Sequence, residues 1–116
     1  PRVEYDKLTD ERRGEPSSSV RERVEAARER QRERFRSETR LQSNADMGPS
    51  DIRRYCDPSP AGKQLLNTTL RQMQLSARAY HRILKLSRTI ADLAGSDRIE
   101  TAHLAEAIQY RPRRMV

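Results

Sequence analysis

Apolar residues recur at steps of three and four along residues 76–94, which is the pattern of a helix with one buried face. Ser76 is a suitable N-cap and Gly95 a suitable residue to end the helix. The residues expected on the buried face are Tyr80, Ile83, Leu84, Ser87, Ile90, Ala91 and Ala94. The pattern therefore predicts a long amphipathic helix that needs other helices to cover it.

Three shorter helices are predicted around it. Ser59 followed by Pro60 is typical of a helix start, and that helix runs to about Gln74. Ser50 is expected to cap a short helix over residues 51–56, and Thr101 to cap the last helix. The expected buried residues are Leu65, Leu66, Thr69, Leu70 and Met73 in the helix 60–74, and Ala102, Leu104, Ala105 and Ile108 in the last one.

The first part of the chain is more polar. We expect residues 1–16 to be a linker or the remnant of a preceding core. We expect residues 17–43 to be a long charged helix that Ser17–Ser19 cap and that runs through about Gln42. Its apolar spine is narrow and consists of Val20, Val24, Ala27, Gln31 and Phe35. So narrow a stripe needs a neighbour, and we expect this arm to be largely flexible. The prediction is an all-α fold: a small helical bundle over residues 44–111, the charged arm, and a basic tail at 112–116.

Composition limits what such a domain can do. The chain has 116 residues, of which 34% are hydrophobic and 35% charged, so it has little apolar material for the core of a self-sufficient enzyme. A net charge of +7 permits a polyanionic partner. The single cysteine, the lack of an apolar run of membrane length and the lack of a signal peptide favour a cytoplasmic protein without membrane contact. Because the chain starts at Pro1 without a methionine, we expect it to be part of a longer protein.

Motifs for catalysis are missing from these residues. The sequence has no GxxxxGK[ST] phosphate loop and no apolar run ending in paired acids that would hold Mg²⁺. His81 and His103 are far apart and have no cysteine partner, so we expect surface or packing roles and no metal site. Cys56 is expected to be a small core residue. We therefore expect no catalytic residue in this part of the protein and no hydrolysis by it alone.

Arg78 has an unusual position. With Ser76 as N-cap it lies in the first helical turn, where the helix dipole disfavours a cation by a few tenths to about 1 kcal/mol. No acidic residue occurs between Pro58 and Ala91 to offset this cost. Helix N–H groups together with an arginine fork can bind phosphate, so Arg78 is a candidate site residue; the alternative is a solvated surface arginine. Arg82 and Lys85 follow on the same face and either widen the site or form a solvated face.

The segments SARAYHRILKLSRTIADL and HLAEAIQYR resemble the C-terminal helical lid of the magnesium-chelatase-like AAA+ ATPases. Within that family the resemblance is closest to the competence protein (ComM) group. The segments PRVEYDKL, SVRERVEAARERQRERF and NADMGPSDIRRYC are similar to the same group, so the resemblance covers nearly the whole chain. SARAYHRIL is also similar to the lid helix of the minichromosome maintenance helicases, in which the sensor-2 arginine matches Arg78.

The resemblance implies a nucleotide-binding core upstream, with ATP and Mg²⁺ bound between core and lid in a hexameric ring. Arg78 would then be sensor 2, which contacts the terminal phosphate in the same or the neighbouring subunit. The arm at 18–42 would correspond to a helix inserted in related members. Leu86 and Leu93 lie beside the main apolar face and would pack either on another lid helix or on that core. No nucleotide is expected to be bound to this part alone.

Several functions stay open at this point. Members like ComM are associated with DNA branch migration during transformation, so the first hypothesis is a lid that couples ATP hydrolysis to DNA remodelling. A variant is the lid of a magnesium-chelatase motor subunit. A different class is a free-standing basic helical module that binds nucleic acid, although no recognition motif or aromatic platform supports it. A pure oligomerisation domain is the last alternative.

Overall fold

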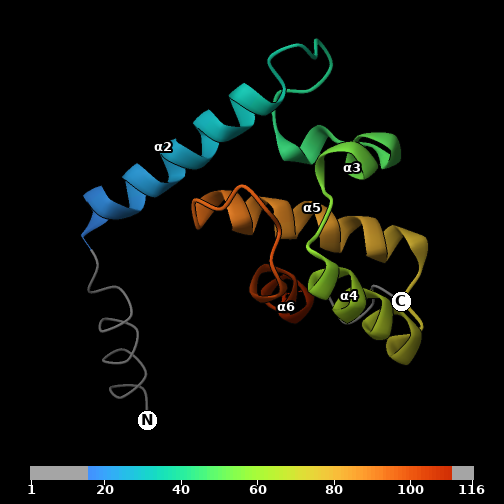
Figure 1. Ribbon diagram of the computed structural model, residues 1–116. Coiled ribbons are helices and arrows are strands. Elements are labelled where there is room, and N and C mark those ends of the chain that lie inside the picture. The colour runs from blue at the N-terminus through green and yellow to red at the C-terminus, as the bar shows by residue number, and fades with distance from the viewer. Residues whose placement is uncertain (1–15, 111–116) are drawn as a thin grey trace, which may run out of the picture.

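The computed structural model describes residues 16–110, which form an all-α bundle (Figure 1). This confirms the predicted fold class. Within the described residues the only strand-like pairing is a single parallel bridge between Pro58 and Ile99. The elements are α2 (Ser17–Arg34), the 3₁₀ turn η1 (Asn44–Asp46), α3 (Pro49–Tyr55), α4 (Pro60–Met73), α5 (Ala77–Leu93) and α6 (Thr101–Gln109).

Helix α5 is the central element of the bundle. In Figure 1, α2 and α3 lie on one side of it and α4 and α6 on the other. It contacts α2, α3 and α6 directly, and α6 also contacts α4. The buried core that these helices share consists of Phe35, Leu41, Met47, Ile52, Cys56, Leu66, Ile83, Leu84, Ala91, Ile99, Leu104 and Ala107.

The predicted α5 is confirmed in its limits and most of its face. Ser76 is the N-cap, and its hydroxyl accepts a hydrogen bond from the Ala79 N–H at 3.1 Å. After the last helical residue, Leu93, a Schellman motif at Gly95 (φ 73°) terminates the helix. In this motif the Gly95 N–H donates to the Asp92 carbonyl and the Ser96 N–H donates to the Ala91 carbonyl. Of the predicted face, Ile83, Leu84, Ser87 and Ala91 are buried, Tyr80 and Ile90 half-buried, and Ala94 exposed. Ala94 was wrongly placed because it lies after the last helical residue.

Helix α4 starts as predicted. The Ser59 hydroxyl accepts a hydrogen bond from the Gly62 N–H at 3.1 Å, and Pro60 is the first helical residue. Of the predicted face, Leu66 and Thr69 are buried, and Leu65 and Leu70 half-buried. Met73 is 38% exposed because it is the last residue of the helix and extends beyond the neighbouring elements.

The prediction for α6 is wrong in which residues form the buried face and in which residue is the N-cap. Leu104 is buried and Ile108 half-buried as expected, but Ala102 and Ala105 are exposed. The helix turns Leu104 and Ala107 toward the core, which leaves the two other alanines on the solvent side. Thr101 is the first helical residue and not the N-cap. The cap is Glu100, whose backbone N–H donates to Nδ1 of His103 at 2.9 Å.

Helix α3 begins one residue earlier than the predicted cap. Gly48 and not Ser50 is the N-cap, and Pro49 is the first helical residue. The Asp51 carboxylate accepts a hydrogen bond from the Gly48 N–H at 2.9 Å and also lies 3.2 Å from Nη2 of Arg40. The sequence pattern pointed to Ser50 and did not indicate Asp51, whose carboxylate accepts the backbone N–H of the N-cap residue Gly48.

Asp51 leads to a pH-dependent prediction. The hydrogen bond from the Gly48 N–H is the largest cause that lowers the pKa of Asp51 from 3.8; burial opposes it, and Arg40 adds to the lowering. A lowered folded-state pKa means stabilisation that is present above pH 3.8 and lost as the pH falls through the folded-state value. Wild type should therefore be more stable than Asp51→Asn at pH 7, and the difference between their free energies of unfolding should shrink as the pH falls below 3.8. Urea titrations of both proteins over this acidic range and at pH 7 measure this; a difference that does not change with pH would contradict it.

Helix α2 differs from the predicted charged helix at both ends. Its N-cap is Pro16, so Ser17–Ser19 are helical residues and not caps, and it ends at Arg34 instead of continuing to about Gln42. The early end lets the chain turn so that Phe35 and Leu41 both enter the core. Of the predicted spine, Ala27, Gln31 and Phe35 are buried, Val24 is half-buried and Val20 is 41% exposed.

The placement of α2 gives it a neighbour within the chain, because it contacts α5. Whether residues 44–111 form a separate unit, and whether the arm is flexible, stay predictions. The predicted linker, residues 1–16, lies outside the described residues except for Pro16. The predicted tail, residues 112–116, also lies outside them. Leu86 packs against the core cluster, while Leu93 is 38% exposed. No helix among the described residues is long and apolar enough to span a bilayer.

Candidate functional site

The three predicted site residues lie together in one groove on α5. Arg78, Arg82 and Lys85 line a hollow of about 650 Å³ that is closed on its other side by Met47, Pro49 and Ile52, at the start of α3. The residues recur at i, i+4 and i+7, so successive turns of the helix present them on one face. No acidic side chain is among the described residues that line this groove.

Arg78 is the second residue of α5 and is exposed. Neither the first turn of the helix nor any described residue within ion-pair distance supplies a carboxylate for it. Arg78 belongs to the first turn of α5, whose leading N–H groups favour an anion, although the Ala79 N–H already donates to the Ser76 hydroxyl. The unfavourable interaction of the Arg78 cation with the helix dipole is thus not offset by a carboxylate of the described residues.

Lys85 and Arg82 have different surroundings. Nζ of Lys85 donates to the backbone carbonyls of Ala45 and Met47 at 3.3 and 3.4 Å, so this half-buried side chain ties α5 to the segment before α3. Arg82 is exposed and lines both this groove and a smaller hollow beside Thr89. Arg82 is therefore free to move toward a ligand, whereas Lys85 contributes charge from a fixed position.

His81 is a groove residue that the sequence reading assigned only a surface or packing role. It lies half-buried between Arg78 and Lys85 and also lines a neighbouring hollow that reaches Cys56 and Leu66. The signal for it was present, because His81 follows Arg78 by three residues and so shares its face. Its ring packs edge-on against Tyr80, with centroids 5.6 Å apart.

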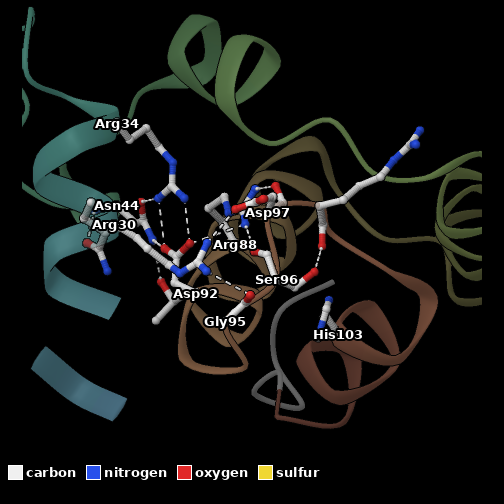
Figure 2. A network of polar contacts seen from close by, with 12 residues as sticks. Arg30, Arg34, Asn44, Arg88, Asp92, Gly95, Ser96, Asp97 and His103 are labelled. Carbon is white, nitrogen blue, oxygen red and sulfur yellow. Dashed lines mark hydrogen bonds and ion pairs between the residues drawn. The ribbon is translucent and has the colours of Figure 1, made fainter. Parts of the chain in front are cut away.

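The other end of α5 carries a buried ion-pair network that sequence reasoning missed. Asp92 lies in the last turn, where the helix dipole disfavours an anion, and its side chain is completely buried. Arg34 of α2, 58 residues away, binds it with both nitrogens: Nη2 to Oδ1 at 2.6 Å and Nη1 to Oδ2 at 2.9 Å (Figure 2). The amide of Asn44 also donates to Oδ2 of Asp92 at 2.9 Å.

Arg88 is the second cation of this network. Its Nη2 lies 3.3 Å from Oδ1 of Asp92, and its two terminal nitrogens donate to the carbonyls of Asp97 and Ser96 at 3.1 and 2.9 Å. Only 4% of Arg88 is exposed. Burial, and then the nearby Arg34, lower the pKa of Arg88 from its ordinary value. The network therefore fastens α2 and the α5–α6 loop to the C-terminal end of α5.

One signal for this network was visible in the sequence. Asp92 is the first acidic residue after a basic stretch of the chain and lies at the wrong end of its helix for the dipole. That conflict has the same form as the conflict at Arg78. The structure supplies Asp92 with two cations but supplies Arg78 with no carboxylate among the described residues. Among the described residues, Arg78 therefore remains without a carboxylate partner.

The structure assigns no reactive role to the cysteine. Cys56 is 2% exposed within the core, as expected, and burial raises its pKa to about 11, so the thiol stays protonated at neutral pH. Its Sγ lies 3.9 Å from Sδ of Met47. Among the described residues, no group of three His, Cys, Asp or Glu side chains has a geometry that could hold a metal ion.

Comparison with known proteins places the chain in a family. Residues 14–111 match the family described as "Magnesium chelatase, subunit ChlI C-terminal". The chain is 46% identical over 99 residues to competence protein ComM of Haemophilus influenzae, which covers 85% of the chain. It is 44% identical over 98 residues to the uncharacterized protein YifB of Escherichia coli, covering 84% of the chain. In both cases the match covers 18% of the relative.

A more distant relative, an uncharacterized protein of Mycobacterium tuberculosis, is 36% identical over 98 residues, covering 84% of this chain and 19% of the relative. The chain thus spans less than a fifth of the length of the curated relatives it matches. The match includes every described helix and both ends of α5. The chain belongs to the family of the C-terminal domain of the magnesium chelatase subunit ChlI.

Proposed function

We propose that this domain is the lid of an AAA+ ATPase and senses the bound nucleotide through Arg78 as sensor 2. The observation that carries the proposal is the groove on α5, in which Arg78 comes from the first helical turn and no described carboxylate lines the walls. ATP and Mg²⁺ would be bound by a core elsewhere in the complete protein. Partners of the domain would be that core and the neighbouring subunits.

The mechanism depends on a difference between nucleotide states. A charge-assisted hydrogen bond from Arg78 to a terminal phosphate is worth roughly 1.5–3 kcal/mol. The bond forms with ATP and is lost after hydrolysis and phosphate release, so the lid favours a different position in each state. Arg82 and His81 lie near enough along the groove to add contacts, whereas Lys85 adds charge.

For the complete protein we propose that lid movement couples ATP hydrolysis to DNA remodelling, as in branch migration during transformation. The support is the similarity to a relative named competence protein ComM. The description of the family favours a second candidate, the motor subunit of a magnesium chelatase. Both functions use the same lid chemistry. DNA-stimulated ATP turnover of the complete protein would favour the first candidate, and stimulation by a porphyrin-binding partner subunit the second.

Replacing Arg78 with alanine in the complete protein tests the sensor role. ATP turnover should fall at least about tenfold, because the transition-state charge on the terminal phosphate loses one guanidinium. Steady-state ATPase assays at saturating ATP measure this. Arg71→Ala is the matched control, since it removes an equally exposed arginine from α4 at a site that does not line the groove.

The outcomes separate the roles clearly. Lost turnover in Arg78→Ala, with normal helicity, normal assembly and an unaffected Arg71→Ala, supports the proposal. Arg78→Lys should recover only part of the activity, because lysine keeps the charge but not the planar fork. Normal turnover in a correctly assembled Arg78→Ala protein would overturn the sensor assignment.

A further inference from the structure

A second hollow, separate from the Arg78 groove, lies where α2, α3 and the end of α5 meet. It has a volume of about 630 Å³ and is lined by four arginines from three helices, Arg30, Arg34, Arg54 and Arg88. Its other lining residues are Ala26, Glu29, Glu33, Tyr55 and Asp97. No residue lines both this hollow and the Arg78 groove, so the two are distinct hollows on the same domain; this one has four arginines and three carboxylates in its lining.

The carboxylates around this hollow are already engaged. Arg30 is paired with Asp97 at 2.6 Å, and Arg54 with Glu38 at 3.4 Å. The glutamates on the rim are paired along α2, Glu29 with Arg32 at 2.8 Å and Glu33 with Arg36 at 3.4 Å. Each of these four described carboxylates therefore already has its own arginine partner.

The buried network behind the hollow has one cation too many. Asp92 is shared by Arg34 and Arg88, with the closer, two-pronged contact to Arg34. Arg88 otherwise donates only to neutral backbone carbonyls. A buried guanidinium without its own counter-charge is unfavourable, and the lowered pKa of Arg88, caused mainly by burial and then by Arg34, has the same origin.

Arg88 also has an unused donor. Its Nε is buried and has no hydrogen-bond acceptor among the described residues. Buried unsatisfied donors are uncommon in proteins and often mark the place of an ion or water that completes the site. An excess positive charge and an open donor thus occur on the same side chain, which lines the hollow.

We propose that this hollow binds a phosphate-type oxyanion, either inorganic phosphate or the phosphate of a small nucleotide. The anion would supply the charge that Arg88 lacks; Arg34 would add positive charge from the α2 side while its fork stays on Asp92, and the exposed Arg54 would orient the anion from the α3 side. Such an anion would join α2 to the α3–α5 part of the bundle. The proposal concerns a different site from the sensor groove and does not depend on that function.

Titration with inorganic phosphate tests the proposal. Calorimetry and thermal unfolding of the protein are measured at constant ionic strength, with chloride as the comparison ion and ADP as the second phosphate source. Phosphate should bind and raise the Tm more than chloride does. Arg78→Ala should keep this binding, because it alters only the other groove, whereas Arg88→Met should weaken it at least about tenfold.

Two features keep the test decisive. Arg88→Met leaves Arg34 and Asp92 as a balanced pair, so it should fold, and far-UV circular dichroism checks this. Arg54→Ala removes a rim side chain that is 68% exposed and should weaken phosphate binding without affecting the fold. If ADP binds and inorganic phosphate does not, the ligand is a nucleotide phosphate. Equal effects of phosphate and chloride, or equal phosphate affinity in wild type, Arg88→Met and Arg54→Ala, would overturn the proposal.

Discussion

Replacing Asp92 with alanine is expected to lower the free energy of unfolding by about 3–5 kcal/mol. The substitution removes the carboxylate that Arg34 and Arg88 share and leaves one buried and one half-buried guanidinium without this counter-charge. It also removes an acceptor for the Asn44 amide. Since small domains have total stabilities of this order, the variant should be largely unfolded at 37 °C. Urea unfolding followed by circular dichroism measures the change.

Asp97→Ala is the matched control for this prediction. Asp97 also pairs with an arginine of α2, Arg30 at 2.6 Å, but its side chain is 97% exposed. An exposed pair contributes between 0 and about 1 kcal/mol, so this variant should remain close to wild type. If Asp92→Ala lost no more stability than Asp97→Ala, the buried network would not be what holds α2 against α5.

Leu104→Ala is the second substitution with a large expected effect, a loss of about 2–5 kcal/mol. Leu104 of α6 is completely buried and packs against α4, where a β-carbon added to Gly62 would lie only 2.7 Å from its Cδ1. A side chain at position 62 would force Leu104 to shift, so the two helices are in close contact at this point. The free energy of unfolding from urea titration measures the effect.

Leu93→Ala provides the comparison for this core deletion. Leu93 is 38% exposed at the end of α5, so its truncation should change stability by less than about 0.5 kcal/mol. A small loss in Leu104→Ala together with a large loss in Leu93→Ala would contradict the described packing of α6 on α4. For Leu93, packing on another lid helix or on a core stays a prediction from the sequence.

The two ends of α5 carry the same electrostatic conflict, and the described part of the chain resolves it at only one of them. The first turn of α5 contains an arginine and its last turn an aspartate, so both ends oppose the helix dipole. At Asp92 the unfavourable interaction with the helix dipole is offset by the ion pairs with Arg34 and Arg88. At Arg78 no carboxylate of a described residue offsets the corresponding interaction. A residue that conflicts with local preference and has no internal partner is a reasonable place to expect a ligand.

Local chemistry was sufficient to predict several features from the sequence. The caps Ser59 and Ser76 and the ending at Gly95 follow from hydroxyl–amide bonds and a positive φ, which involve only a few neighbouring residues. The groove face with Arg78, Arg82 and Lys85 follows from helical spacing alone. The role of Arg78 as sensor 2 stays a prediction, because the site also needs residues outside this chain.

The sequence by itself determined the all-α fold, the amphipathic face of α5 and the place of an arginine in its first turn, because each depends on short-range spacing. Only the tertiary structure decided that α2 ends at Arg34, that α6 turns Ala107 rather than Ala105 inward, and that Arg34 pairs with Asp92 across 58 residues. The physical reason is that burial and charge pairing depend on which helices pack together. A residue's spacing along the chain shows which face it is on but not which partner that face meets.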